Sequence, residues 1–429
     1  MNSKQLIKHI KNGGLDAVFT DLYGSDKLAY QRDRYIDVIE NYASRYDTAS
    51  ERDVLLFSVA GRSELSGNHT DHNHGKVIAG SIDLDIIAAA SARSDSLIRL
   101  TSRGFGENTV DISQYTEPRE ELYNTSEALI AGMCRAFSDK RYSVGGFDAY
   151  TASNVLKGSG LSSSAAFEDM IGNILNHMYN GGKVDNVEIA KLAQFSENVF
   201  FGKPCGLMDQ MACAVGGIIS IDFEDTRAPL IEKLDFDIAA AGYNLCIVNT
   251  GGNHADLGED YASVPSEMRA VAECFGKKVL REVEERDILA NIKMLREKVG
   301  DRAILRALHF MNENKRVDAQ KKALKCGDLD AYFDNVTASG RSSFCYLQNV
   351  YTTKNLTEQG LSLALCLAED YLRDKRAAWR VHGGGFAGTI QAYVPACDVE
   401  GFRKTMDAAF GDGACIALKV RRLGALRVF

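Results

Sequence analysis

The stretch KGSGLSSSAAF, residues 157–167, combines glycines, three consecutive serines and two alanines immediately before a helical pattern. The apolar residues that follow recur at spacings of three and four, typical of an amphipathic helix: Phe167, Met170, Ile171, Ile174, Leu175 and Met178. Gly181 and Gly182 come next, as is common after the last turn of a helix. The sequence therefore predicts a glycine–serine loop that leads directly into a helix N-terminus.

Such a loop is suited to binding phosphate. The first backbone N–H groups of a helix are free, and the helix dipole places partial positive charge there. Small side chains let a phosphate approach the backbone, and serine hydroxyls can contact a phosphate oxygen or Mg²⁺. The Walker A pattern G-x-x-x-x-G-K-[ST] is absent from the chain. The alternative is that the serines only cap the helix, since serine is a favoured N-cap residue.

Composition indicates an ordinary globular enzyme. The chain has 429 residues, which predicts two or three domains, and 45% of them are hydrophobic and 25% charged. The formal net charge of -8 does not favour nucleic acid or an anionic membrane surface as partners. We therefore expect small-molecule partners, a monomer and no obligate protein partner.

Cysteine usage and hydropathy indicate a cytoplasmic location. Ten cysteines are scattered singly without a C-x-x-C pair, which is typical of reduced thiols in the cytosol. The first residues, MNSKQLIKHIKNGG, lack the apolar core of a signal peptide. No run of 18 apolar residues occurs that would span a bilayer.

The predicted elements mix helices and strands without strict alternation, which favours an α+β fold. Residues 1–50 are expected to be helical, with a buried stripe of Tyr30, Tyr35, Ile36, Val38 and Ile39. Short apolar runs predict strands at 54–60, 77–82, 84–90, 147–153, 217–223, 245–250 and 389–394. Helices are expected at 185–201, where Asp185 and Glu188 fit a capping box, and over much of 265–330. A domain boundary is placed near residue 225.

Three clusters rich in glycine and polar residues could carry chemistry: residues 61–75, 157–166 and 381–389. A single acid, Asp209, lies in a further stretch of small and apolar residues. Together they indicate phosphoryl transfer, which needs a phosphate cradle, Mg²⁺, positive charge and a positioned hydroxyl. His69, His72 and His74 also suggest a zinc site, but they lack the H-E-x-x-H spacing and have no paired cysteines nearby.

Four motifs resemble those of the GHMP small-molecule kinases and, among them, the galactokinase family. The galactokinase signature G-R-x-N-L-I-G-E-H-T-D-Y-N-x-G corresponds to GRSELSGNHTDHNHG, residues 61–75. The phosphate loop G-x-G-L-S-S-S-A corresponds to GSGLSSSAA at 158–166, and P-C-G-x-M-D-Q to PCGLMDQ at 204–210. A late motif, G-G-G-F-G-G, corresponds to GGGFAG at 383–388. The motifs occur in the family's order and span most of the chain.

The resemblance implies a two-domain fold with the active site between the domains. Residues 1–225 would form a ribosomal-S5-like domain, with 1–50 as a possible helical extension. Residues 226–429 would form a ferredoxin-like domain. The implied reaction is ATP-dependent phosphorylation of the C1 hydroxyl of a sugar, with D-galactose as the expected substrate and Mg²⁺ as the metal.

The resemblance also implies roles for single residues. Asp209 would be the catalytic carboxylate, and Arg62 would keep it ionised and stabilise charge on the phosphoryl group. ATP would bind the phosphate loop, namely Gly158, Gly160, Leu161, Ser162, Ser163, Ser164 and Ala165. Ser164 and Glu197 would hold Mg²⁺, because hydroxyl and carboxylate oxygens are ligands that this ion prefers. The sugar would contact Asn68, His69, Asp71 and Tyr261.

Each of these residues also has an ordinary structural interpretation. Asp209 alone could cap a helix, Arg62 could form a surface ion pair, and Glu197 could lie on the solvated face of its helix. His69 and Asp71 could be polar loop residues, Tyr261 a half-buried core ring, and residues 383–388 a tight turn before a strand.

The sequence departs from the galactokinase signature at a few positions. Asn68 stands where the family has a glutamate that contacts the sugar O6 hydroxyl, His72 replaces a tyrosine, and Ser63-Glu64 replaces the x-Asn pair. A neutral residue at position 68 leaves galacturonate, arabinose or an N-acetylhexosamine open as alternative substrates. If Asn68 faces position 6, Asn68→Glu is expected to strengthen the use of galactose. A non-catalytic sensor of galactose and ATP is a further alternative, although the phosphate loop, Asp209 and Arg62 are all intact.

Overall fold

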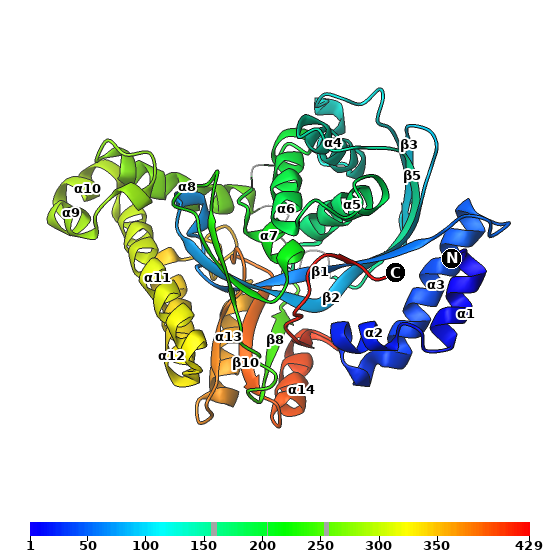
Figure 1. The fold of residues 1–429 in the computed structure, drawn as a ribbon. Helices are drawn as coiled ribbons and strands as arrows, with labels where there is room; N and C mark the ends of the chain where they lie inside the picture. Colours follow the sequence, from blue (N-terminus) through cyan, green and yellow to red (C-terminus); the bar gives the residue numbers. More distant parts are fainter. Residues whose placement is uncertain (156–160, 204, 253–256) are drawn as a thin grey trace.

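The computed structural model describes residues 1–155, 161–203, 205–252 and 257–429. It contains two β-sheets with helices packed on both, so the predicted α+β class is confirmed (Figure 1). Within the described residues, no helix combines the length and the apolar character needed to cross a bilayer.

The larger sheet is built on two long antiparallel strands. β1 (Leu55–Ser66) pairs with β2 (Lys76–Ala92), and the strand order is β12-β1-β2-β5-β3-β4. The other members are β5 (Phe147–Ser153), β3 (Leu97–Ser102), β4 (Glu107–Asp111) and β12 (Leu426–Arg427). In addition, β6 (Ile218–Asp222) pairs with the first residues of β2, and β7 (Leu230–Leu234) pairs with β6. The separate strands predicted at 77–82 and 84–90 are therefore one continuous strand. Its polar interruption, Asp83, is buried because Lys27 Nζ and the Lys419 N–H donate to its carboxylate.

The register of β1 shifts twice, between Ala60 and Arg62 and between Glu64 and Ser66. Irregularities of this kind redirect side chains and are common beside active sites. They fall in the part of β1 that carries the glycine–arginine motif.

Helices cover both faces of this sheet because β2 alternates its side chains between them. Ala88 and Ala90 face a core shared with the helices that follow β4, whereas Ile87 and Ala89 face the N-terminal helices. The first group is α4 (Ser126–Asp139), α5 (Ser163–Tyr179), α6 (Asn186–Phe195) with the π-helical turn η4 (Ser196–Phe200), and α7 (Met208–Val215). The second group is α1 (Ser3–Lys11), α2 (Asp16–Tyr23), the 3-10 turn η1 (Ser25–Lys27) and α3 (Leu28–Tyr46).

The predicted helical character of residues 1–50 is confirmed, but one member of the predicted stripe is wrong. Tyr35, Val38 and Ile39 are buried on α3, Ile36 is partly buried, and Tyr30 is 59% exposed. Tyr30 lies five residues before Tyr35, a spacing that places it off the buried face of a helix with 3.6 residues per turn.

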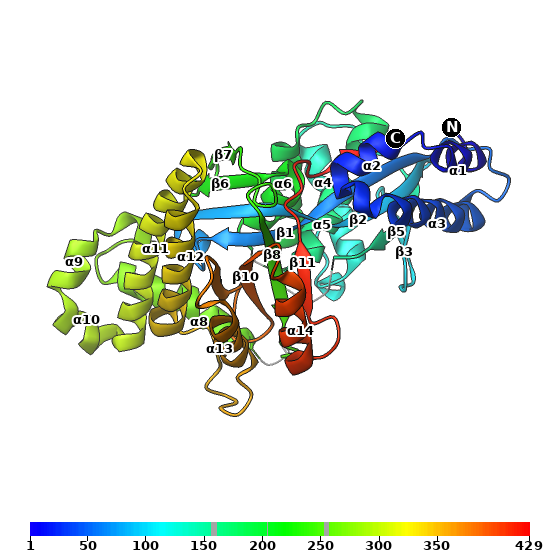
Figure 2. The same cartoon turned by 90° about the horizontal axis from the view of Figure 1, so that it is seen from below.

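The smaller sheet has the antiparallel order β11-β8-β10-β9, namely β11 (Cys415–Leu418), β8 (Tyr243–Asn249), β10 (Thr389–Pro395) and β9 (Ala378–Val381). Figure 2 shows β11, β8 and β10 side by side. One face packs on α13 (Gly360–Leu372) and α14 (Val399–Phe410), and the other on α12 (Leu329–Ser342). The remaining helices are α8 (Gly258–Glu273), α9 (Glu285–Ala290), α10 (Ile292–Val299) and α11 (Asp301–Cys326). Short turns complete the structure: η2 (Asp71–Asn73), η3 (Glu120–Leu122), η5 (Leu280–Glu282) and the π-helical η6 (Ser343–Leu347).

The chain returns to the larger sheet at its C-terminal end, where β12 pairs with β1. The larger sheet also includes β7, which follows residue 225. The boundary near residue 225 therefore stays a prediction.

Candidate active site

Arg62 and Asp209 form a two-pronged ion pair between strand β1 and the first turn of α7. Arg62 Nε donates to Asp209 Oδ1 and Arg62 Nη2 to Oδ2, each at 2.8 Å. Arg62 is buried, whereas 34% of the Asp209 side chain is exposed. Loss of contact with water by itself raises the pKa of Asp209. The positive charges of Arg62 and Lys203 and the hydrogen bonds from Ser162 and Arg62 outweigh this effect and lower the pKa below its usual value. The carboxylate is thus held ionised and partly open to a ligand.

Ser162, at the start of α5, is the second residue that contacts this carboxylate. Its hydroxyl donates to Asp209 Oδ2, and it makes no side-chain hydrogen bond to cap α5. Its backbone lies in the left-handed region, with φ of 57°. The N–H of Arg62 also donates to the carbonyl of Leu161 at 3.3 Å. The end of the serine loop is therefore joined to the ion pair, a link that capping alone does not explain.

The helix predicted after the serine loop is α5, which begins at Ser163. Leu161, Ala165 and Ala166 are buried and pack this end of the helix against the core. The predicted phosphate-binding residues Gly158 and Gly160 lie outside the described residues.

Ser164 and Glu197, the predicted metal ligands, contact each other. Ser164 Oγ donates to Glu197 Oε1 at 3.3 Å, and Glu197 is buried in the π-helical turn η4. Such turns are frequent at functional sites. Gln210 Nε2 donates to the other Glu197 oxygen at 2.6 Å and to Glu168 Oε2 at 3.2 Å. Burial, followed by the charge of Glu197, raises the pKa of Glu168 well above its usual value.

This set of oxygens fits Mg²⁺ chemically. Ser164 offers a hydroxyl and Glu197 a carboxylate, both hard donors, and Mg²⁺ commonly completes its shell with water and phosphate oxygens. Across the described ranges, no group of three or more His, Cys, Asp or Glu side chains is arranged to hold a metal ion. His69 and His72 have other contacts, namely the Gly384 carbonyl and the Asn73 side chain.

Lys203 is a cation that the sequence analysis did not select. Its Nζ lies 3.0 Å from Glu197 Oε1, and 58% of its side chain is exposed. It directly precedes the P-C-G motif, and this adjacency is the signal that could have identified it. Its charge also helps to keep the pKa of Asp209 low.

Asp71, a predicted sugar ligand in η2, lies beside Asp209. Burial, followed by the charge of Asp209, raises the pKa of Asp71 to about 6. Gly206, in the loop that leads to Asp209, is in close contact with it: a Cβ at this position would lie 2.3 Å from Asp71 Oδ2. The structure thus brings the galactokinase-like motif and the P-C-G motif together.

The other three predicted sugar ligands all contact the glycine-rich turn at 383–385. Asn68 Nδ2 donates to the Gly383 carbonyl at 2.7 Å, His69 Nε2 lies 2.8 Å from the Gly384 carbonyl, and the Tyr261 hydroxyl donates to the Gly385 carbonyl at 2.8 Å. The Tyr261 ring also packs edge-on against Phe386, with ring centroids 5.5 Å apart. Burial lowers the pKa of His69, which favours its neutral form.

A cavity of about 660 Å³ adjoins the start of α5 and was not assigned from the sequence. Ser163, Ser164 and Phe167 of α5 line one side, and the other side includes Arg103, Phe105 and Glu127. Its walls come from α4, α5, β5 and the turn between β3 and β4, so no compact motif marks it. Its volume is within the range of small-molecule sites.

Comparison with known proteins also shows similarity to galactokinases and other GHMP kinases. Residues 40–92 match the galactokinase galactose-binding signature, and residues 128–217 match the GHMP kinases N terminal domain. A galactokinase of Streptomyces coelicolor is 30% identical over 370 residues, which cover 86% of this chain and 91% of that protein. A galactokinase of Lactobacillus helveticus is 30% identical over 395 residues, 87% of this chain and 94% of that protein.

Solved structures confirm the fold. The structure of Lactococcus lactis galactokinase complexed with galactose superposes with a TM-score of 0.75 at 24% identity, covering 90% of this chain and 98% of that one. Methanococcus jannaschii mevalonate kinase superposes with a TM-score of 0.60 at 14% identity, covering 86% and 98%. The predicted GHMP kinase fold is therefore confirmed, and the chain belongs to the galactokinase family of GHMP kinases.

Proposed function

We propose that this protein transfers the γ-phosphoryl group of ATP to the C1 hydroxyl of D-galactose. The observation that carries the proposal is the Arg62–Asp209 pair, whose partly open carboxylate lies beside both the start of α5 and Asp71. Membership in the galactokinase family supports galactose as the substrate.

Asp209 is the proposed base. Because its pKa is lowered, the carboxylate is ionised at neutral pH and can accept a hydrogen bond from the C1 hydroxyl. As the C1 oxygen bonds to the γ-phosphorus, the bond from that phosphorus to the oxygen leaving with ADP breaks, and the C1 proton passes to Asp209. Arg62 fixes the position of the carboxylate through two hydrogen bonds.

The nucleotide is proposed to bind along the start of α5. The helix N-terminus and the serine loop, including Gly158 and Gly160, would hold the phosphates, and the cavity of about 660 Å³ would take the base and ribose. Ser164 and Glu197 would hold Mg²⁺, which when bound neutralises charge on the phosphates. Lys203 adds positive charge on the same side of the site.

Sugar hydroxyls are proposed to contact Asp71, His69 and Tyr261. The imidazole of His69 and the carboxylate of Asp71 come from one stretch of the chain and the phenol of Tyr261 from another. His69 and Tyr261 meet at the turn 383–385, and Asp71 contacts Gly206. Polar groups that lack a partner in a wrong sugar would penalise its binding.

We expect the enzyme to act in the cytoplasm on free sugar and ATP. All ten cysteines are free thiols, and the negative net charge does not favour nucleic acid or an anionic membrane. The monomeric state stays a prediction, which light scattering of the purified protein would test.

The decisive experiment measures ADP release with Mg-ATP across galactose, galacturonate, arabinose, fucose, N-acetylgalactosamine and glucose. The proposal expects galactose to give the highest kcat/KM and galactose 1-phosphate to be the product. If another sugar gave the highest kcat/KM, the proposed kinase reaction would stand, but galactose would be wrong as the proposed substrate. Binding of sugar without ADP release from any of them would indicate a sensor instead.

A further inference from the structure

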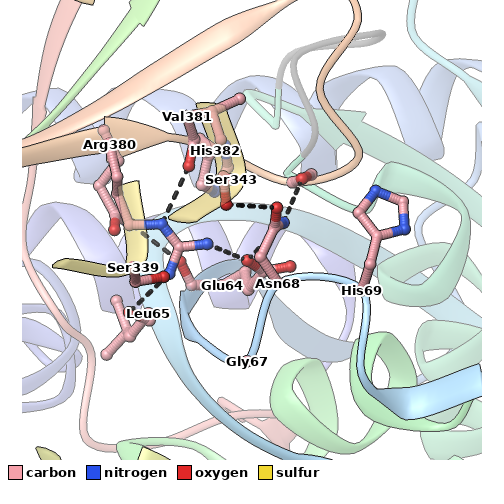
Figure 3. Close-up of polar contacts among 12 residues, drawn as sticks. Glu64, Leu65, Gly67, Asn68, His69, Ser339, Ser343, Arg380, Val381 and His382 are labelled. Atoms are coloured by element: carbon pink, nitrogen blue, oxygen red, sulfur yellow. Dashed lines mark hydrogen bonds and ion pairs between the residues drawn. The ribbon is translucent and has the colours of Figure 1, made fainter. Parts of the chain in front are cut away.

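Arg380, on β9, is a fully buried cation whose charge is paired by Glu64 of β1. Its Nη2 contacts Glu64 Oε1, its Nη1 donates to the Leu65 carbonyl at 3.2 Å, and its Nε donates to the Val381 carbonyl at 3.0 Å (Figure 3). Glu64 is buried as well. The pair therefore joins the larger sheet to the smaller one, away from solvent.

Asn68 extends this pair to the glycine-rich turn. Its Nδ2 donates to Glu64 Oε1 at 3.1 Å and to the Gly383 carbonyl at 2.7 Å. Its Oδ1 accepts from Ser343 Oγ at 3.1 Å and from Asn349 Nδ2 at 2.9 Å. A side-chain amide offers two donors and two acceptor sites, so these contacts use its whole hydrogen-bonding capacity. Asn68 is also fully buried.

Glu64 and Asn68 are two of the positions at which the chain departs from the galactokinase signature. That signature has asparagine at the position of Glu64 and glutamate at the position of Asn68, so the two residue types are exchanged here. The structure shows that the exchanged side chains are hydrogen-bonded to each other. Exchanging the two residue types in this chain would therefore keep one carboxylate and one amide at positions 64 and 68.

Electrostatics explains why the two positions should change together. With Glu64 present, a second glutamate at position 68 would place two carboxylates in contact without water, which is strongly unfavourable. With asparagine at both positions, Arg380 would lose its direct charge partner. The other nearby carboxylate, Glu313, is already bonded to Arg316, Ser339 and the N–H of Gly67.

We infer that Glu64 and Asn68 act as one exchanged pair of positioning residues, which holds the turn 383–385 at the sugar-binding end of the site. Glu64 neutralises the charge of Arg380, and Asn68 links Glu64 to the Gly383 carbonyl by hydrogen bonds. The next two carbonyls of the turn, those of Gly384 and Gly385, are the ones that His69 and Tyr261 contact. Asn68 then acts through the turn and not on the sugar itself. The inference rests on the proposed function for its effect on sugar binding.

A double-mutant cycle tests the inference with Glu64→Asn, Asn68→Glu and the double exchange, which restores the signature's residue types. The measurements are Tm and the separate KM values for galactose and ATP. Each single variant should lower Tm and raise the galactose KM about tenfold, with a much smaller change in the ATP KM. The double variant should recover most of the Tm and most of the galactose KM. A double variant no better than the sum of the singles would overturn the inference.

Two further variants keep the test decisive. If the single variants do not fold, Glu64→Gln and Asn68→Asp repeat the exchange with a different pair of side chains. The double variant is then expected to have a higher Tm and a lower galactose KM than either of these single variants. Glu232→Gln removes a carboxylate that pairs with Lys321 and Lys325 at a distant surface, and it should leave both KM values unchanged. Because Tm does not depend on turnover, absent activity in the wild type would count against the proposed function, whereas absent recovery of Tm would count against the pair.

Discussion

Gly206, two residues before α7, is in contact with the carboxylate of Asp71 in η2. A Cβ at position 206 would lie 2.3 Å from Asp71 Oδ2, well inside van der Waals contact. The glycine of the P-C-G motif thus sets the position of a proposed sugar ligand in a distant segment.

Gly206→Ala should therefore displace Asp71 and weaken sugar binding. We expect the galactose KM to rise about tenfold, with the ATP KM nearly unchanged, because the added methyl group affects one side of the site. Steady-state kinetics with each substrate varied would check this. Gly258→Ala is the matched control, since none of the residues that the structure describes has an atom within 4 Å of a Cβ there. Equal effects of the two substitutions would contradict the proposed contact.

Asp209→Asn should abolish turnover while ATP still binds. The amide cannot take the C1 proton, so kcat should fall by on the order of 10²–10⁴. Calorimetric titration with ATP would show an affinity close to that of the wild type. Asp225→Asn, at an exposed ion pair with Arg227, should keep full activity. Turnover of Asp209→Asn near the wild-type rate would remove Asp209 from the mechanism.

Ser162→Ala and Ser162→Gly separate the hydroxyl of Ser162 from its backbone conformation. Both lose the hydrogen bond to Asp209, so both should lower kcat, by about tenfold. Glycine adopts positive φ without strain, so Ser162→Gly should be more stable than Ser162→Ala by about 1 kcal/mol. Measuring kcat tests the contribution of the hydroxyl to turnover, and thermal denaturation tests the effect of the backbone conformation on stability. A full rate in either variant would mean that this hydrogen bond does not contribute to catalysis.

The pH dependence of kcat/KM for galactose should reflect Asp71. Burial and the charge of Asp209 raise its pKa to about 6, and the proposed sugar contact requires the ionised form. The value should therefore fall as pH decreases through about 6, earlier than for an ordinary aspartate. The Asp71→Asn variant should have a low kcat/KM for galactose at every pH, without the decrease near pH 6. A wild-type profile that stays flat down to pH 5 would contradict the assignment.

Acid stability should depend on Glu313. Burial alone raises its pKa, but Arg316, His309, Arg380 and Ser339 lower it from 4.5 to about 2. Because the pKa is lower in the folded protein than in the unfolded chain, the ionised Glu313 stabilises the fold by about 3 kcal/mol at pH values above about 4.5. This stabilisation is lost as the pH falls from about 4.5 to 2. Glu313→Gln should flatten the dependence of unfolding free energy on pH in this window, measured by urea denaturation. Glu285→Gln, at a surface pair with Lys315, should keep the wild-type slope.

The structure also changes one prediction made from sequence. If Asn68 faced position 6 of the sugar, Asn68→Glu would be expected to favour galactose. The four protein contacts of Asn68, one of them to Glu64, now predict the opposite for the single variant. This reversal follows from residues far away in the chain, which a one-dimensional motif cannot include.

Sequence alone determined the family, the α+β class, strand β5 and the helix after the serine loop, because motif spacing and local periodicity reside in neighbouring residues. It also selected Arg62 with Asp209 and Ser164 with Glu197, pairs that prove to be in contact. Only the tertiary structure decided that Ser162 contacts Asp209, that Lys203 contacts Glu197, that a cavity adjoins the start of α5, and that Glu64 and Asn68 lie beside one cation. Those relationships depend on how separate segments of the chain pack together, and the burial that strengthens the polar contacts exists only after the chain has folded.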